Sequence, residues 1–277
     1  MWVQRVHSIA QQNEDPLLAA FASLRDRELR GEVDGRFIAE GEVVLRVLLA
    51  QRRYPILAVL LADAQWERLQ EALFHLPPEI PVYVAPLAVM REIVGFPIHR
   101  GILALGSRGA DAALSDVVPA IGKSIVVGLC GITNHDNVGG IFRNAAAFAV
   151  NGAMLDRATC DPLYRKAVRV SVGGSLVVPH AFVADEGAMI DALVERGYTV
   201  LALSPRGALR VGVDPPPVID KLALLVGSEG PGLSSRTIAR CQSARIEMVS
   251  GWDSLNVAVT SGIALHWLHR VMRPSCA

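Results

Sequence analysis

The sequence is poor in cysteine, and the cysteines it has are not arranged for disulfides or zinc. Four are present with no CxxC pair among them, and no histidine stands at zinc-ligand spacing: Cys130, Cys160, Cys241 and Cys276. This argues against a disulfide framework and against a metal site. Because the sequence also carries no recognisable signal peptide, we expect a reduced, cytoplasmic location. The apolar runs VVLRVLLA and ILAVLLA are too short to cross a bilayer, so no membrane partner is expected.

An excess of charge of either sign is missing too. Lys+Arg and Asp+Glu both number 27, so net charge gives no sign of a nucleic-acid partner, and any basic patch must come from folding. Only three of the basic residues are lysines: Lys123, Lys166 and Lys221. Arginine suits bidentate contacts with phosphate, although the same bias equally reflects a GC-rich genome.

What the chain does contain is ample apolar material, 51% of 277 residues, enough for one large or two ordinary domains. In the first part we predict a helix over 37–51, with one face formed by Phe37, Val43, Val44, Val47 and Leu48. Apolar runs of strand length and amphipathic helical patterns alternate after it, the strands at 56–62, 81–85 and 101–107 and the helices at 63–76 and 86–96. This alternation predicts a small α/β unit.

A Gly- and Ala-rich stretch then separates two parts of the chain. We predict a first domain over 1–106, a linker over 107–121 that contains Pro119, and a second domain over 122–277. The second part alternates strand-length runs with helical patterns, the runs at 124–130, 152–156, 198–204, 222–228 and 244–249. Such alternation predicts a parallel sheet covered on both faces, with a ligand beyond the carboxyl ends of its strands.

Three loops of the second part carry polar residues at these carboxyl ends. In GITNHDNVGGIFRNAAAF, Asn137 lies just ahead of a predicted helix that Gly139 and Gly140 open, and Arg143 follows further along it. Free backbone N–H groups at such a start suit an anion or a polar ligand. The simpler alternative is a capped helix with a solvated arginine.

The second loop, EGPGLSS, follows the run at 222–228. Its Gly-Pro-Gly turn lets a ligand approach the backbone, and Glu229 leads it, although an ordinary turn with a helix-capping serine explains it as well. Neither GxGxxG nor GxxxxGK[ST] is present. This disfavours a nicotinamide-dependent enzyme and a nucleotide triphosphatase.

The third loop opens DSLNVAVTSGIALHWLHR, residues 253–270, which continues as an apolar helix. Asp253 is a good N-cap, and Ser254 and Asn256 either take part in capping or belong to a site.

Taken in this order, the three loops resemble the SpoU (TrmH-like) branch of the SPOUT RNA methyltransferases. The matching stretches are NVGGIFR (137–143), GSEGPGL (227–233) and IEMVSGWDSLNV (246–257). One departure is that Asn134 and His135 stand where the family often has Asp-Pro, so a proline constraint on the loop is lost. In the first part, RFIAEGEVVLRVLL and FPIHRGILALG resemble the L30e-like RNA-binding domain that accompanies this family.

The resemblance implies transfer of a methyl group from S-adenosyl-L-methionine to a ribose 2′-hydroxyl of RNA, with rRNA favoured over tRNA. It implies a C-terminal trefoil knot and a homodimer whose active sites form across the interface. The catalytic residues it implies are Asn137, Arg143, Glu229, Ser254 and Asn256. The cofactor contacts it implies are Leu203, Gly227, Ile246, Met248 and Leu255, of which Ile246 and Leu255 would otherwise be interpreted as core.

Arg143 resembles the family's catalytic arginine, supplied by the partner subunit. Because a guanidinium group is a poor base, our hypothesis is that Arg143 grips the adjacent phosphate and stabilises the developing alkoxide. The last helix is a candidate for the interface, although core packing explains its apolar residues equally well: Ile263, Leu265, Trp267 and Leu268.

RNA contacts outside the site are expected in DPLYRKAVRVSVGGS. Arg165 and Arg169 lie four residues apart on one predicted helix, with Arg157 and Lys166 nearby, so they either follow a phosphate backbone or form a solvated face. Weaker candidates in the first part are Arg30, Arg36, Arg52, Arg53, His99 and Arg100. A catalytically inactive RNA-binding protein of the same fold is the main alternative, and the N-terminal domain argues against a methyltransferase for small molecules.

Overall fold

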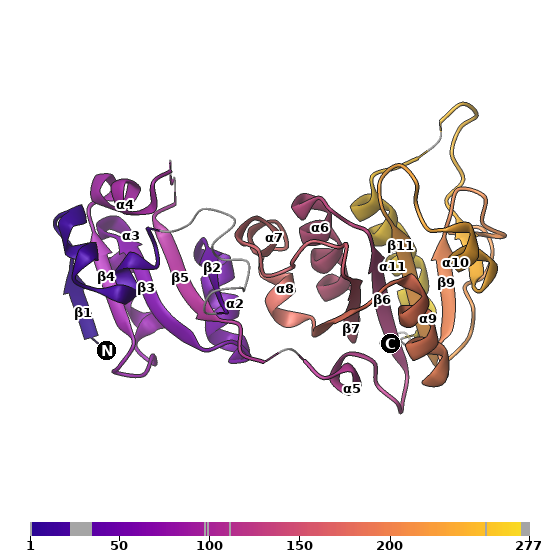
Figure 1. Ribbon diagram of the computed structural model, residues 1–277, viewed down its shortest axis with the longest axis horizontal. Coiled ribbons are helices and arrows are strands. Elements are labelled where there is room, and N and C mark those ends of the chain that lie inside the picture. The colour runs from indigo at the N-terminus through magenta and orange to yellow at the C-terminus, as the bar shows by residue number, and fades with distance from the viewer. Residues whose placement is uncertain are drawn as a thin grey trace. The chain divides into compact units, whose positions relative to one another are not determined.

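A computed structural model describes residues 2–22, 35–96, 98, 100–110, 112–252 and 254–272 (Figure 1). The chain forms two compact units. The first comprises Met1–Ala110 together with Leu163–Leu176, and the second comprises Asp111–Pro162 and Val177–Ala277. Within the described residues, no helix combines the length and the apolar character that a membrane span requires.

The first unit is built on a five-stranded mixed sheet. The order of its strands is β1 (Trp2–Arg5), β4 (Pro81–Ala85), β3 (Ile56–Ala62), β5 (Ile102–Ser107) and β2 (Arg36–Glu40). The pairs β1–β4 and β4–β3 are parallel, whereas β3–β5 and β5–β2 are antiparallel. The helical elements are η1 (Ile9–Asn13), α1 (Pro16–Ala19), α2 (Glu42–Gln51), α3 (Asp63–Leu73) and α4 (Leu87–Val94).

Alternate strand residues of this sheet enter two separate apolar clusters. Phe37 and Val59 belong to one cluster, which includes residues of α2 and α3, whereas Ile38 and Leu60 belong to the other, with residues of α4. Because successive strand side chains point to opposite faces, the sheet is covered by helices on both sides. The predicted small α/β unit is therefore confirmed.

The prediction of a helix over 37–51 is wrong for its first third. Residues Arg36–Glu40 form β2, and α2 begins only at Glu42. Gly41 lies between them with φ +97°, a conformation that ends the strand and that L side chains rarely adopt. Phe37 therefore packs from a strand, while Val43, expected on the buried face, is exposed. Strand β1 was not predicted at all.

The second unit is built on a seven-stranded sheet in which every described strand pair is parallel. The order is β10 (Leu209–Arg210), β12 (Gln242–Arg245), β9 (Thr199–Leu203), β11 (Lys221–Gly227), β6 (Ser124–Cys130), β7 (Gly152–Asp156) and β8 (His180–Val183). The predicted parallel sheet is confirmed. Its helices are α5 (Leu114–Val117), α6 (His135–Ala147), α9 (Glu186–Glu195), α10 (Ser235–Ala239) and α11 (Val257–Met272). Of the two remaining helices, α7 (Arg165–Val170) lies in the first unit, and α8 (Gly174–Val177) spans the return to the second.

The strand that we predict over 244–249 is observed two residues earlier, at Gln242–Arg245. Strand β12 ends at Arg245, and Ile246–Val249 continue as irregular chain. This leaves Ile246 and Met248 at the carboxyl end of the sheet, half-buried rather than enclosed between the sheet and its helices. Strands β8 and β10 were missed, because runs of four and two residues are too short to give a periodic signal.

Candidate active site

Helix α6 begins at the carboxyl end of β6 and brings the first polar group to the site. The side chain of Asn134 caps the helix by accepting a hydrogen bond from the N–H of Asp136, so the start of the helix is satisfied with His135 in place of a proline. Asn137, in the first turn, is 3% exposed. A buried amide of this kind requires hydrogen-bond partners.

Asn137 finds its partners in the two other loops predicted for the site. Its Nδ2 donates to Oε1 of Glu229 at 2.6 Å, and its Oδ1 accepts from Nδ2 of Asn256 at 2.8 Å. Asn256 Nδ2 also lies 3.4 Å from Oε1 of Glu229. Three side chains that are distant in sequence thus form one polar cluster, which we call the Asn–Glu–Asn cluster.

Asn256 has a second task at the start of α11. Its Oδ1 accepts hydrogen bonds from the N–H groups of Ala258 at 3.0 Å and Val259 at 3.2 Å, so Asn256 is the residue that caps this helix. Asp253, which we predicted as the cap, lies outside the described residues. Capping and site formation are therefore combined in a single side chain.

A second asparagine, Asn144, fixes α6 against α11. Its Nδ2 donates to the carbonyl oxygen of Ala258 at 2.7 Å and to Oγ of Ser261 at 3.1 Å. The helices also approach closely at Gly140, where an added Cβ would lie 2.6 Å from Cβ of Ala258. This packing determines how near Asn256 comes to Asn137, a role for Asn144 that sequence reasoning missed.

Beside the Asn–Glu–Asn cluster lies a hollow of about 500 Å³ at the carboxyl ends of β9, β11 and β12. All five residues predicted for the cofactor line it: Leu203, Gly227, Ile246, Met248 and Leu255. Glu229, Ser254 and Asn256 line it too. Leu255 is 40% exposed, so this residue belongs to the wall of the hollow and not to the core.

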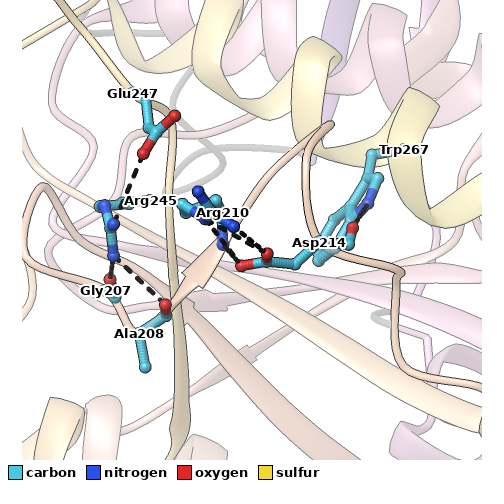
Figure 2. Close-up of polar contacts among 7 residues, drawn as sticks. All are labelled: Gly207, Ala208, Arg210, Asp214, Arg245, Glu247 and Trp267. Carbon is cyan, nitrogen blue, oxygen red and sulfur yellow. Dashed lines mark hydrogen bonds and ion pairs between the residues drawn. The ribbon is translucent and has the colours of Figure 1, made fainter.

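The turn after β9 is held in place by Arg245, the last residue of β12 (Figure 2). The guanidinium group donates to the carbonyl oxygens of Gly207 at 2.6 Å and Ala208 at 3.2 Å, and pairs with Glu247 at 3.6 Å. Gly207 itself packs so closely on Ala244 that a Cβ would lie 2.2 Å from the Ala244 carbonyl carbon. Arg245 lines the hollow, and so fixes one wall of it.

The next turn of chain is anchored to α11. Arg210 donates to both carboxylate oxygens of Asp214, an arrangement that raises the pKa of Arg210 and lowers the pKa of Asp214 chiefly through these hydrogen bonds. The indole N–H of Trp267 on α11 donates to the carbonyl oxygen of Asp214 at 3.0 Å (Figure 2). The helix that starts at Asn256 is thereby tied to the chain that follows the hollow's wall.

The backbone at Gly227 admits no side chain. An added Cβ would lie 2.4 Å from the carbonyl carbon of Gly232 and from the N of Leu233, because the Glu229–Gly232 turn folds back onto the end of β11. Backbone groups therefore form this wall of the hollow, next to apolar side chains and one carboxylate. The combination suits a ligand that has both a planar polar edge and an apolar body.

Arg143 does not join this constellation. It follows Asn137 by six residues, which places it about 240° around the helix and roughly 9 Å along it. The side chain is exposed, does not line the hollow, and has no hydrogen bond or ion pair with any other part of the chain that the structure describes. The site of one chain is thus assembled without its own Arg143.

The residues predicted to contact RNA are divided between the two units. Arg157 is exposed directly after β7 in the second unit. Arg165 and Arg169 lie on α7 in the first unit, and both pair with Glu40, while Lys166 is half-buried on the same helix. Among the weaker candidates, Arg53 lies over the ring of Tyr54 at 5.6 Å, and Arg30 and His99 lie outside the described residues.

The last helix is only partly available to a partner. Leu265, Trp267 and Leu268 are buried within the chain, so these residues of the predicted interface serve core packing. Ile263 remains 40% exposed, and Val259, one turn earlier, is 53% exposed. Over the described ranges, no group of three or more His, Cys, Asp or Glu side chains gathers as a metal site.

Comparisons with known proteins agree with this architecture. A curated relative, an uncharacterized tRNA/rRNA methyltransferase of Mycobacterium tuberculosis, is 37% identical over 263 residues, covering 91% of this chain and 88% of its own length. The solved AdoMet-bound rRNA methyltransferase of Sinorhizobium meliloti has a TM-score of 0.78 at 24% identity, with 97% of this chain and 98% of that chain covered.

The SpoU methyltransferase AviRb of Streptomyces viridochromogenes, solved in complex with AdoMet, has a TM-score of 0.76 at 21% identity over 92% of this chain and 96% of that chain. Similarity at this level of identity establishes the fold. The sequence profile described as the SpoU rRNA Methylase family matches residues 124–266, more than half of the chain. The predicted resemblance is therefore confirmed: the chain belongs to the SpoU rRNA Methylase family.

Proposed function

We propose that this protein transfers the methyl group of S-adenosyl-L-methionine to a ribose 2′-hydroxyl of RNA. The observation that carries the proposal is the Asn–Glu–Asn cluster at the edge of the hollow, which joins all three predicted loops through bonds of 2.6 and 2.8 Å. A hydroxyl group is a poor nucleophile, so an enzyme must align it and help to remove its proton. Amide and carboxylate groups beside a ligand-sized hollow suit that task.

The hollow fits S-adenosyl-L-methionine in size and in chemistry. Its backbone wall at Gly227 can pair with the adenine edge, and Leu203, Ile246, Met248 and Leu255 offer apolar contact. Glu229 places a negative charge near the expected sulfonium cation. When bound, this cofactor supplies the methyl group. Two structural relatives are described as bound to AdoMet, which supports the assignment.

The ribose would be oriented by Asn137, Glu229, Ser254 and Asn256, which together offer both donors and acceptors at the edge of the hollow. A further solved structure with the same fold is described as an RNA 2′-O ribose methyltransferase, with a TM-score of 0.76 at 20% identity. Because the family name and the Sinorhizobium relative both refer to rRNA, we favour rRNA over tRNA as the substrate.

Arg143 would serve the site of a second copy in a homodimer. It is exposed, and its position on α6 is about 240° around the helix from Asn137. On the adjoining helix α11, Val259 and Ile263 expose apolar surface that a partner copy would cover. There Arg143 would grip a phosphate next to the target ribose and stabilise the developing alkoxide, while a phosphate oxygen or a water takes the proton.

Arg157, exposed at the carboxyl end of the sheet, is our first candidate for a phosphate contact outside the site. A C-terminal trefoil knot, an L30e-like first domain over 1–106, a linker over 107–121, a methyltransferase domain over 122–277 and a cytoplasmic location also belong to this proposal.

The proposal is tested with purified protein, methyl-labelled S-adenosyl-L-methionine and total RNA from a strain that lacks the gene. The RNA is size-fractionated, digested to nucleosides and scored for 2′-O-methyl products, with Arg143→Ala run in parallel. We expect label in a 2′-O-methylnucleoside of the rRNA fraction and none with the variant.

Other outcomes would change the assignment. Label in a base-methylated nucleoside would overturn the ribose target, and label in the small RNA fraction would replace rRNA by tRNA. No label together with no binding of the cofactor in calorimetry would favour the inactive RNA-binding protein.

A further inference from the structure

One segment of the chain packs with a unit to which its neighbours in sequence do not belong. Residues Leu163–Leu176, which contain α7, cluster with the first unit, whereas the chain before and after them belongs to the second. Leu163, Val168 and Leu176 enter the same apolar cluster as the α2 residues Val44 and Leu45. The chain therefore passes from one unit to the other three times rather than once.

The polar part of this packing centres on one buried carboxylate. The side chain of Glu40, at the end of β2, is only 9% exposed, and its Oε2 lies 2.7 Å from Nη1 of Arg165. Nη1 of Arg169, one helical turn further on, lies 3.4 Å from both carboxylate oxygens. A carboxylate so far removed from water is tolerated only when it is paired, so these arginines are required where they are.

Arg165 is committed to this position by further contacts. Its guanidinium carbon lies 4.4 Å from the ring centroid of Phe96, a cation–π arrangement, and its Nε is buried without a hydrogen-bond partner. Among the RNA-binding candidates it is thus the one least able to turn toward a phosphate. We call Glu40, Arg165 and Arg169 the latch.

The turn after α7 is held equally firmly. Val172 has φ +54°, a strained conformation for a β-branched residue, and Gly173 follows with φ +84°. A Cβ on Gly173 would lie 3.0 Å from Cβ of Val47 on α2. Such strain persists only where the surrounding packing demands it, which marks this segment as a defined attachment to the first unit.

The chain that leads into this segment is bound to the loop that starts α6. Asp156, at the end of β7, accepts hydrogen bonds from the N–H groups of Gly131 at 2.9 Å and Thr159 at 2.8 Å. Thr159 Oγ1 in turn accepts from the N–H of Ile132 at 3.1 Å, and the N–H of Cys160 donates to the carbonyl oxygen of Ile132 at 2.9 Å. Gly131 and Ile132 lead directly to the helix that carries Asn137.

We propose that the latch is a positioning device: Glu40, Arg165 and Arg169 hold residues 163–176 in place within the first unit, and the chain directly before these residues fixes the loop of Asn137. Loss of the latch would therefore loosen this segment and, through the chain before it, the loop that carries Asn137. This inference rests on the proposed function. It also assigns to Arg165 and Arg169 a role other than the predicted contact with RNA.

The test compares Glu40→Gln, Arg165→Gln and the double variant in the full-length protein. Arg5→Gln is the matched control, because Arg5 pairs with Asp63 in the same unit but on the exposed surface. Hydrogen exchange should quicken across residues 165–176 in both latch variants and stay unchanged in α3, and the control should match the wild type throughout. Unchanged exchange in both latch variants would overturn the proposal.

Methyl transfer to total rRNA provides the second readout. We expect the KM for RNA to rise about 10- to 100-fold in each latch variant, because the loop that carries Asn137 is then held less precisely. The affinity for S-adenosyl-L-methionine should stay within about twofold of the wild type, because its hollow lies elsewhere. The KM for RNA of the double variant should be little higher than that of either single variant.

Direct RNA contact by the arginines predicts the opposite behaviour. Glu40→Gln would then free both arginines and tighten RNA binding, and Arg165→Gln would lower the salt slope of binding by about one. Either result would overturn the latch. If Glu40→Gln fails to fold, Arg165→Lys replaces it in the test. This variant keeps the positive charge but loses the stacking on Phe96, and faster hydrogen exchange at residues 165–176 would support the proposal. Hydrogen exchange can be measured on an inactive protein. A wild-type protein without methyl transfer would therefore refute the proposed function, and the exchange experiment would still test the latch.

Discussion

The side-chain amide of Asn256 donates a 2.8 Å hydrogen bond to the side-chain carbonyl oxygen of Asn137, 119 residues earlier in the chain. The side-chain carbonyl oxygen of the same Asn256 accepts from the N–H groups of Ala258 and Val259 in the first turn of α11. One side chain thus provides hydrogen-bond partners for two kinds of group: the free backbone N–H groups at the start of α11 and the side-chain oxygen of the buried Asn137.

The two halves of Asn256 can be separated by substitution. Asn256→Asp keeps an acceptor for the helix but replaces the donor to Asn137 with a carboxylate facing Glu229, so we expect α11 to keep its cap and methyl transfer to fall about 100-fold or more. Asn256→Ala should lose the transfer and in addition about 1 kcal/mol of stability. Thermal melts and single-turnover assays measure both. An Asp variant with more than a tenth of the wild-type rate would contradict the role of the Nδ2 donor.

Arg143 should complement a damaged site in trans. Arg143→Ala and Asn137→Ala should each be inactive alone, since each removes part of every site. When the two are unfolded together and refolded as a mixture, about a quarter of the wild-type activity should return, because half of the dimers are mixed and each contains one complete site. Refolding either variant alone is the control. If the mixture stays inactive while gel filtration reports mixed dimers, Arg143 does not act across the interface.

The residues of the hollow could be identified from sequence because three loops with characteristic spacing converge at one edge of a parallel sheet. The geometry that supports them could not. Asn144 reaches Ala258 and Ser261 across more than a hundred residues, and Arg245 reaches the carbonyl of Gly207 across 38. Such contacts depend on which helices and turns become neighbours in the folded chain. The local sequence pattern around each residue does not indicate these neighbours.

The segment that contains Arg165 illustrates a different limit. Its helical spacing was evident, and two arginines on one face fit solvent or phosphate equally well. Their actual partner, Glu40, lies 125 residues earlier than Arg165, at the end of a strand that we had interpreted as helix. Because that strand was misassigned, nothing in the sequence suggested a buried carboxylate in need of two cations.

Gly227→Ala should abolish cofactor binding without unfolding the protein. The new methyl group would meet backbone atoms of Gly232 and Leu233 at 2.4 Å and push the Glu229 turn away from the hollow. Gly187→Ala is the control, since its Cβ would meet only a side-chain oxygen of Asp185 at 3.1 Å. We expect the affinity for S-adenosyl-L-methionine to fall at least about 100-fold, roughly the loss of a well-placed polar contact and its backing wall. Calorimetry that finds a loss below fivefold would show that this wall does not touch the ligand.

The alkaline limit of stability should depend on Cys130. Burial raises the pKa of this thiol, so the folded protein holds its proton after the unfolded chain has released it. Stability is then complete below about pH 8.5, the ordinary thiol value, and falls above it by up to about 1.4 kcal/mol per pH unit. The hydroxyl groups of Tyr83 and Tyr198, whose pKa values burial also raises, should add to this fall from about pH 10.

Cys130→Ala should therefore flatten the fall between about pH 8.5 and 10, even though the smaller side chain lowers stability at neutral pH by about 1 kcal/mol. Urea denaturation across this range measures the slope. Cys160→Ala is the control, because Cys160 is only partly buried. A slope that is the same for Cys130→Ala and the wild type would mean that the thiol ionises in the folded protein as readily as in the unfolded chain.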